Sequence, residues 1–219
     1  FSRQLLTSQE AERKRIAAEL HDSLGQNLLV IKNYALMGLN AAPSENPARE
    51  HLEEISDSAT LALEEVRQIA HNLRPYQLER FGLSNTLQTM LRQVANASDI
   101  EFNYEIDQLN EVFAPEDEIA VYRIVQETLN NILKHSEAKE ASVVIKRVAD
   151  EIQLTFTDNG RGFAVEPADD TEWQTRGLGL TGTAERVRIL GGQLHIQSAP
   201  GQGTTIQITL KPTLHGSTN

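Results

Sequence analysis

A histidine and an aspartate, His21 and Asp22, stand side by side within the stretch AAELHDSLGQNLLV. The leucines of this stretch recur one turn apart and predict a helix, yet Gly25 lies in its interior, at a cost of about 1 kcal/mol relative to alanine. On a helical wheel Ala18 and Gly25 flank His21, so small neighbours leave the imidazole open to a bulky anionic reactant. The pattern therefore allows a reactive histidine. The plainer alternative is a pair of surface residues beside a packed seam, with Gly25 allowing close helix packing.

A second polar group lies on the helix predicted to end in QETLNNILKHSEA, residues 126 to 138. Glu127, Asn131 and Lys134 share one stripe opposite an apolar stripe, and His135 follows. An amide oxygen is a hard ligand of the kind that Mg2+ accepts, and cationic side chains bind phosphate oxygens. A functional interpretation places Asn131 at a magnesium ion, with Lys134 and His135 at phosphates. The alternative is a polar side that merely faces solvent.

The segment DNGRGF, residues 158 to 163, follows a predicted strand. Asn-Gly is a strong hairpin signal, but the residues after Phe163 do not alternate as a returning strand would. Their long polar run, which ends in RGLGLTG, predicts a mobile lid instead. Asp158 would then accept a hydrogen bond from the exocyclic amine of adenine, while Gly160 and Gly162 let the backbone approach the base.

The glycines of RGLGLTG also satisfy the pattern G-x-G-x-x-G, with Gly177, Gly179 and Gly182. No predicted strand leads into them, and the chain about twenty residues later reads SAPGQG rather than ending a second strand in an acid. Both features argue against a dinucleotide-binding fold. A G-x-x-x-x-G-K-[ST] loop and the H-R-D and D-F-G motifs of eukaryotic protein kinases are absent from the sequence as well.

Two long helices must position His21. The first runs without proline from about residue 8 to 40, the loop NAAPSENPA follows, and a second helix with the same apolar period ends before Pro75. Two long helices joined by a short loop form an antiparallel hairpin. Because a single hairpin has too little core, we expect two copies to pair as a homodimeric four-helix bundle.

The rest of the chain mixes helix and strand patterns. Helices are predicted near 83–95, 115–135 and 181–190, and strands near 100–106, 141–148, 151–157, 192–198 and 204–210. The predicted class is α+β, in which the hairpin precedes an α/β sandwich with helices on one face of a mixed, mainly antiparallel sheet. We assign residues 1–76 to the hairpin, 77–83 to a linker, 84–213 to the second domain and 214–219 to a tail.

The composition excludes several functions. A formal net charge of -11 argues against direct nucleic-acid binding, which requires a basic face. Because the chain has no cysteine, disulfides and thiolate metal sites are excluded. No apolar run reaches the roughly 18 residues of a membrane helix, so we expect no membrane contact by this chain. It begins FSRQLLTSQE without a methionine, as a fragment of a longer protein would.

Several of these motifs resemble one family. The stretch ERKRIAAELHDSLGQ closely resembles the phosphoacceptor box of bacterial sensor histidine kinases, in the branch of the nitrate sensors and the membrane-fluidity thermosensor. VRQIAHNLRPYQLERFGL resembles the end of that family's dimerisation hairpin. E-x-x-x-N-x-x-K-H, D-x-G-x-G, G-L-G-L and GQGTT resemble, in order and spacing, the ATP-binding boxes that histidine kinases share with gyrase, MutL-type repair proteins and the heat-shock ninety chaperone. The resemblance covers nearly the whole chain.

The resemblance implies an ATP-dependent protein-histidine kinase that phosphorylates His21 and passes the phosphoryl group to an aspartate of a response regulator. Asp22 would orient the imidazole, and Gln26 would orient a water that dephosphorylates the regulator. Glu127 would polarise a phosphate or its water, and Glu127 and Asn131 are the implied Mg2+ residues. The implied ATP-binding residues are Asn131, Lys134, His135, Asp158, Gly160, Gly162, Gly177, Leu178, Gly179, Leu180, Gly182 and Thr204.

By the same resemblance, the partner is the receiver domain of a response regulator with a helix-turn-helix output domain. The chain would be cytoplasmic, and the longer parent protein is of a kind often anchored in the inner membrane. Two other functions stay open. One is an ATPase that uses nucleotide to drive dimer closure, with Glu127 activating water. The other is a catalytically silent dimeric scaffold that binds partners through the hairpin.

Overall fold

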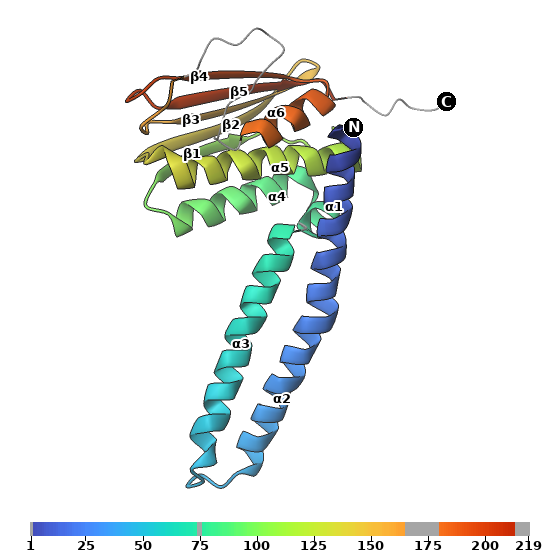
Figure 1. The fold of residues 1–219 in the computed structure, drawn as a ribbon, viewed down its shortest axis with the longest axis vertical. Helices are drawn as coiled ribbons and strands as arrows, with labels where there is room; N and C mark the ends of the chain where they lie inside the picture. The colour runs from blue at the N-terminus through green and yellow to red at the C-terminus, as the bar shows by residue number, and fades with distance from the viewer. Residues whose placement is uncertain (1, 74–75, 165–179, 213–219) are drawn as a thin grey trace, which may run out of the picture. The chain divides into compact units, whose positions relative to one another are not determined.

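The chain folds as two compact units, Phe1–Tyr76 and Gln77–Asn219. The computed structural model describes residues 2–73, 76–164 and 180–212. The first unit is helical and the second contains a mixed sheet with helices (Figure 1). The predicted α+β class, a helical hairpin followed by an α/β sandwich, is therefore confirmed.

The first unit is an antiparallel helical hairpin (Figure 1). Its first arm is continuous and consists of α1 (Ser2–Glu19), the π-helical turn η1 (Leu20–Gly25) and α2 (Gln26–Ala41), and its second arm is α3 (Ala48–Leu73). At the tip, the guanidinium of Arg49 donates hydrogen bonds to the carbonyls of Leu39 and Ala42, at 2.5 and 3.0 Å. Arg49 thereby satisfies carbonyls that the end of α2 leaves without partners.

Small side chains hold the two arms of the hairpin together. Ala17 and Ala35 of the first arm and Ala59 and Ala70 of α3 are almost fully buried, which lets the helices approach closely. Many larger apolar side chains stay exposed in the single chain, namely Leu24, Leu29, Val30, Ile31, Tyr34, Met37, Ile55, Leu61 and Ile69. The hairpin alone therefore buries only part of its apolar surface.

The second unit is a sheet with helices on one face (Figure 1). Its elements are α4 (Tyr76–Ala97), β1 (Glu101–Ile106), α5 (Pro115–Asn131), the π-helical turn η2 (Ile132–Ser136), β2 (Glu140–Val148), β3 (Glu151–Asp158), α6 (Leu180–Ile189), β4 (Gln193–Ser198) and β5 (Thr204–Leu210). The strand order is β1-β2-β3-β5-β4, with β1 parallel to β2 and the other neighbours antiparallel. This is the mainly antiparallel mixed sheet that the sequence predicts.

Alternating strand residues and one face of α5 form the core of the second unit. The strands β2 and β3 alternate between buried and less buried positions, as a half-covered sheet requires. Helix α5 begins at Pro115 and carries three acids in its first turn, which both favour a helix start. Fully buried side chains of this core include Tyr122, Ile124, Leu129, Ile145, Leu154, Phe156 and Ile208. The sheet and α5 are thereby fixed against each other, and both contribute walls to the pocket described next.

Two local details of the helices are not apparent from the sequence. The turns η1 and η2 are π-helical, so each holds more residues than an α-helical turn and shifts the stripe of side chains beyond it. An apolar pattern with a constant period of 3.6 residues does not reveal such a local insertion. The expected linker, residues 77–83, lies within α4, which is kinked where Gly82 adopts a φ of 76°.

Candidate functional site

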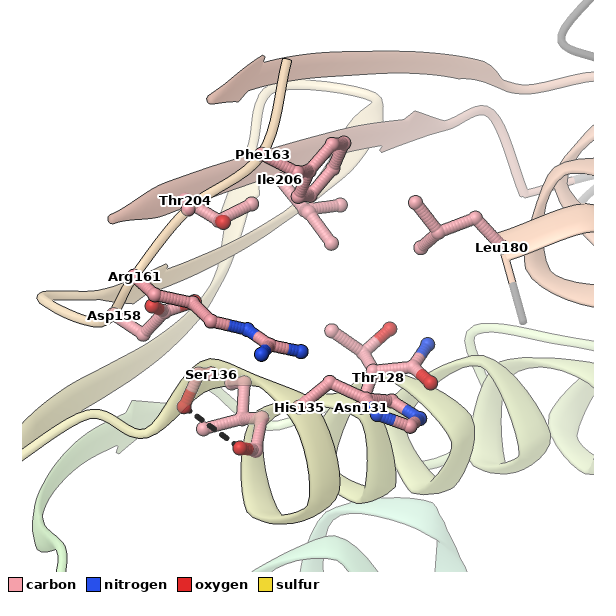
Figure 2. A pocket seen from close by; sticks show the side chains of 12 residues that line it. Thr128, Asn131, His135, Ser136, Asp158, Arg161, Phe163, Leu180, Thr204 and Ile206 are labelled. Carbon is pink, nitrogen blue, oxygen red and sulfur yellow. Dashed lines mark hydrogen bonds between the residues drawn. The ribbon is translucent and has the colours of Figure 1, made fainter. Parts of the chain in front are cut away.

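A pocket of about 350 Å³ lies in the second unit, between α5 with η2 on one side and the ends of β3 and β5 on the other (Figure 2). Its walls are formed by Thr128, Asn131, Ile132, His135, Ser136, Asp158, Arg161, Gly162, Phe163, Leu180, Thr204 and Ile206. The pocket brings together six of the predicted ATP-binding residues, which are Asn131, His135, Asp158, Gly162, Leu180 and Thr204.

Asp158, the last residue of β3, places a buried carboxylate at one end of the pocket. Only 7% of the residue is exposed. Burial raises the pKa of this carboxyl, and hydrogen bonds from the backbone N–H groups of Gly160 and Thr204 oppose that shift. The N–H of Gly160 donates to Oδ1 of Asp158 at 2.9 Å. The carboxylate is thus fixed in orientation and presents an acceptor to the pocket.

The hydroxyl of Thr204 lies at the same end, within a small hydrogen-bond network. Ser198 Oγ donates to the carbonyl of Gly203 at 2.9 Å and accepts from the N–H of Phe163 at 2.9 Å. Ser198 Oγ and Thr204 Oγ1 are 3.0 Å apart. Because a hydroxyl has a single proton, Thr204 must be the donor in this last contact. Thr204 Oγ1 therefore keeps its lone pairs for an incoming donor.

The backbone of Gly162 forms the floor of this end of the pocket, and Gly160 lies two residues before it in the chain. A Cβ atom added at Gly160 would collide with the carbonyl of Ser136, and one added at Gly162 would collide with the carbonyl of Ala199. Gly162 also has a φ of 57°, which side chains disfavour. Both glycines therefore allow main chain to pack directly on main chain beside Asp158, as the D-x-G-x-G pattern predicts.

Asn131 and His135 line the α5 and η2 side of the pocket (Figure 2). The amide nitrogen of Asn131 is buried and has no hydrogen-bond partner among the described residues, although buried polar atoms are normally paired. Such an atom indicates that a ligand or water completes the site. Lys134 is exposed and is not among the residues that line the pocket.

Glu127 is engaged by an arginine that the sequence analysis missed. Nη1 of Arg186, on α6, lies 2.7 Å from Oε2 of Glu127, and the two side chains are 11% and 29% exposed. Gly182 makes room for this ion pair, because a Cβ there would lie 2.7 Å from Oε1 of Glu127 and 3.0 Å from Nη1 of Arg186. The pair joins α5 to α6, and neither residue lines the pocket.

Other pocket residues also escaped the sequence analysis, chiefly Arg161, Phe163 and Ile206. Arg161 and Phe163 belong to the segment DNGRGF, in which only the aspartate and the glycines were interpreted. A basic residue between two glycines of a nucleotide motif was a usable signal. Ile206 gives no such signal in the sequence, because its place opposite α5 depends on the pairing of β5 with β3.

His21, Asp22 and Gln26 lie at the other candidate site, in and beside the π-helical turn η1. All three are exposed. No hydrogen bond or ion pair joins the side chains of His21 and Asp22 to the part of the chain that the structure describes. The imidazole is open to solvent, as the small neighbours predict.

Some predicted features fall beyond these observations. Gly177, Leu178 and Gly179, and nearly all of the predicted lid, lie outside the described residues. Within the described ranges, no cluster of three or more His, Asp or Glu side chains is placed to hold a metal ion.

Comparisons with known families match both units. Residues 12–78 match a family described as histidine kinase, and residues 116–214 match one described as the histidine kinase-, DNA gyrase B- and HSP90-like ATPase. The chain belongs to the histidine kinases. The two matched regions contain His21 and the pocket, respectively, so this histidine kinase chain carries both domains in the order that the motifs predict.

Relatives of this histidine kinase chain support the same assignment. The signal transduction histidine-protein kinase/phosphatase DegS of Brevibacillus brevis is 31% identical over 96% of this chain and 54% of its own length. The sensor histidine kinase MctS of Rhizobium johnstonii is 30% identical over 94% of this chain and 44% of its own length. The chain thus spans about half the length of these curated relatives.

A solved structure shows the same fold. The histidine kinase domain of the blue-light activated histidine kinase from Erythrobacter litoralis EL346 superposes with a TM-score of 0.53 at 17% identity, covering 85% of this chain and 94% of that one. Among the described residues of this chain, none of the helices combines the length and apolar character that a membrane crossing requires.

Proposed function

We propose that this chain is the catalytic core of a sensor histidine kinase, which phosphorylates His21 with ATP and passes the phosphoryl group to an aspartate of a response regulator. The observation that carries the proposal is an open imidazole in a histidine-kinase hairpin, encoded in one chain with an ATPase-type pocket. Because ATP and receiver domains are found in the cytoplasm, we place the chain there and expect its longer parent to be anchored in the inner membrane.

The pocket has two ends that suit the two ends of ATP. Asp158 and Thr204 offer acceptors at one end, which fits the exocyclic amine of adenine. Asn131 and His135 lie across the pocket from them (Figure 2), where the phosphates would lie. By family resemblance Lys134 and the glycines Gly177, Gly179 and Gly182 would assist there.

We propose Asn131 as a protein ligand of Mg2+. Its amide nitrogen has no hydrogen-bond partner among the described residues and can donate to a phosphate oxygen. Its amide oxygen is the atom that would ligate Mg2+, which typically takes one or two protein oxygens and completes its shell with phosphates and water. Glu127 is less suited to direct ligation, because Arg186 already neutralises its carboxylate. We therefore expect Glu127 to polarise a phosphate or its water. When bound, the metal ion would neutralise charge on the phosphates.

The proposed phosphoryl transfer needs little from the protein beyond position and charge. One ring nitrogen of neutral His21 attacks the γ-phosphorus, the bond from phosphorus to the bridging oxygen breaks, and ADP leaves. The imidazole then carries a positive charge until its other ring nitrogen loses a proton. Asp22, the next residue, would stabilise this charge as an orienting group or general base. Gln26 would hold the water that hydrolyses the phosphorylated regulator.

We further propose that the hairpin pairs with a second copy of itself. A groove of about 450 Å³ between α2 and α3 includes the exposed side chains of Ile31 and Ile55. Its full lining is Leu28, Ile31, Glu54, Ile55, Ser58, Ala59 and Ala62. Exposed apolar surface of this kind marks an interaction site, and two hairpins make a four-helix bundle. The response regulator, with its helix-turn-helix output domain, would dock on this dimer.

Incubation with γ-labelled ATP and Mg2+ tests the proposal. The wild-type chain should acquire an acid-labile label that His21→Gln abolishes, and the label should move to a receiver domain on mixing. His21→Gln changes an exposed side chain and should leave the thermal melt unchanged, which serves as the folding control. Release of free phosphate without protein label would instead support the ATPase, and neither product would support the silent scaffold.

A further inference from the structure

A permanently charged guanidinium lies within the nucleotide pocket. Of the described residues that line it, Arg161 is the one with a fixed positive charge, and Asp158 carries the negative charge. Figure 2 shows the Arg161 side chain extending from the Asp158 end of the pocket toward Thr128 and His135. The guanidinium therefore lies between the two ends of the pocket, in a chain whose net charge is -11.

The backbone of Arg161 is held firmly at the pocket floor. Its N–H donates to the carbonyl of Ser136 at 2.7 Å, and its carbonyl accepts from the N–H of Gly201 at 2.6 Å. These two bonds join the residue to the end of η2 on one side and to the β4–β5 turn on the other. The root of the side chain is thus fixed, while the guanidinium keeps its rotamer freedom.

The present partner of Arg161 is a weak one. Its Nη1 lies 3.2 Å from Oε1 of Glu137, and the two side chains are 56% and 74% exposed. Exposed ion pairs of this kind contribute little or nothing measurable to stability. A guanidinium meets a phosphate through parallel charge-assisted hydrogen bonds, which are roughly twice as strong as neutral ones. A phosphate that enters the pocket should therefore displace Glu137.

We infer that Arg161 leaves Glu137 when nucleotide binds and holds the phosphate nearest the ribose. The inference rests on the proposed function, which places adenine at Asp158 and the distal phosphates near Asn131. The guanidinium lies between those two positions (Figure 2), where the first phosphate passes. Arg161 is thus a nucleotide-binding residue that recognises the 5′-phosphate group rather than the base.

Calorimetric titration of the full chain with adenosine, AMP and ADP tests this assignment. Arg161→Met should weaken AMP and ADP binding about tenfold, as loss of one charge-assisted contact predicts, and should leave adenosine binding unchanged. Glu137→Gln should act in the opposite direction and tighten AMP binding two- to threefold, roughly what release of a weak ion pair gives. Opposite effects of the two variants are difficult to produce by misfolding.

Lys146→Met is the matched control. Lys146 is also exposed and ion-paired, to Glu105 at 3.1 Å, but it does not line the pocket, so its loss should change none of the three affinities. Unchanged AMP binding by Arg161→Met, or an equal loss of adenosine binding, would overturn the inference while leaving the proposed function intact. A wild-type chain that binds none of the three ligands would overturn both.

Discussion

The structure leaves enough space at Gly25 for a small side chain. A Cβ there would meet only the carbonyl of Leu20, at 3.6 Å, and the residue has right-handed helical dihedrals. Gly25→Ala should therefore stabilise the chain by about 1 kcal/mol while slowing phosphorylation of His21, because the methyl group occupies space beside the imidazole. Thermal melts and initial rates of labelling measure the two effects. Gly38→Ala is the control, where Leu52 lies 3.1 Å from the added Cβ and should remove most of the gain.

Asp158 should make the stability of the second unit depend on pH. Because burial raises its pKa, the folded chain holds the proton of this carboxyl up to a higher pH than the unfolded chain does. Stability should therefore fall as the pH rises from the ordinary aspartate pKa of about 4 through the raised value, and level off above it. Asp158→Asn removes this loss and weakens adenosine binding. Urea unfolding at several pH values measures the free energy of unfolding of the wild type and of Asp158→Asn. The same pH dependence in both proteins would contradict a raised pKa at Asp158.

Helices α5 and α6 are joined by the ion pair of Glu127 and Arg186. Both side chains are largely buried, so removing one partner leaves an uncompensated charge. Arg186→Met and Glu127→Gln should each destabilise the chain, and the double variant should lose about 2 kcal/mol less than the sum. A double-mutant cycle on urea unfolding measures this coupling. Arg188→Met, which removes an exposed partner of Glu185 on the same helix, should cost little.

The elements themselves are largely predictable from the sequence, and the contacts between them are not. Apolar periodicity and proline positions predict the hairpin and every described strand within a few residues. The π-helical turns at Leu20–Gly25 and Ile132–Ser136 escape such analysis, because it assumes a constant period. The motifs predict Asp158, Asn131 and Thr204 in one pocket. Arg186 was missed because its partner lies 59 residues away, and pairing at that separation depends on tertiary packing.

At the scale of the whole molecule, the exposed apolar surface of the hairpin predicts the oligomeric state. Ile31 and Ile55 are 47% and 45% exposed and line the same groove. A charge at either position would be buried in the proposed dimer at a cost of several kcal/mol. Ile31→Glu should therefore convert the dimer to a monomer in sedimentation velocity experiments. Asn33→Glu places the same charge on a neighbouring exposed polar position and should leave the dimer intact. A wild-type monomer at micromolar concentration would refute the pairing.

The main-chain floor at Gly160 and Gly162 also bears on how this protein can escape an inhibitor. A compound that binds mainly to that floor contacts backbone atoms, which every residue type shares. A larger residue at Gly160 would collide with the carbonyl of Ser136, and one at Gly162 with the carbonyl of Ala199. Resistance would have to arise on the opposite wall, from side chains such as Thr128 or Ile132. Compounds anchored at the glycine end should accordingly select fewer resistant variants than compounds anchored on α5.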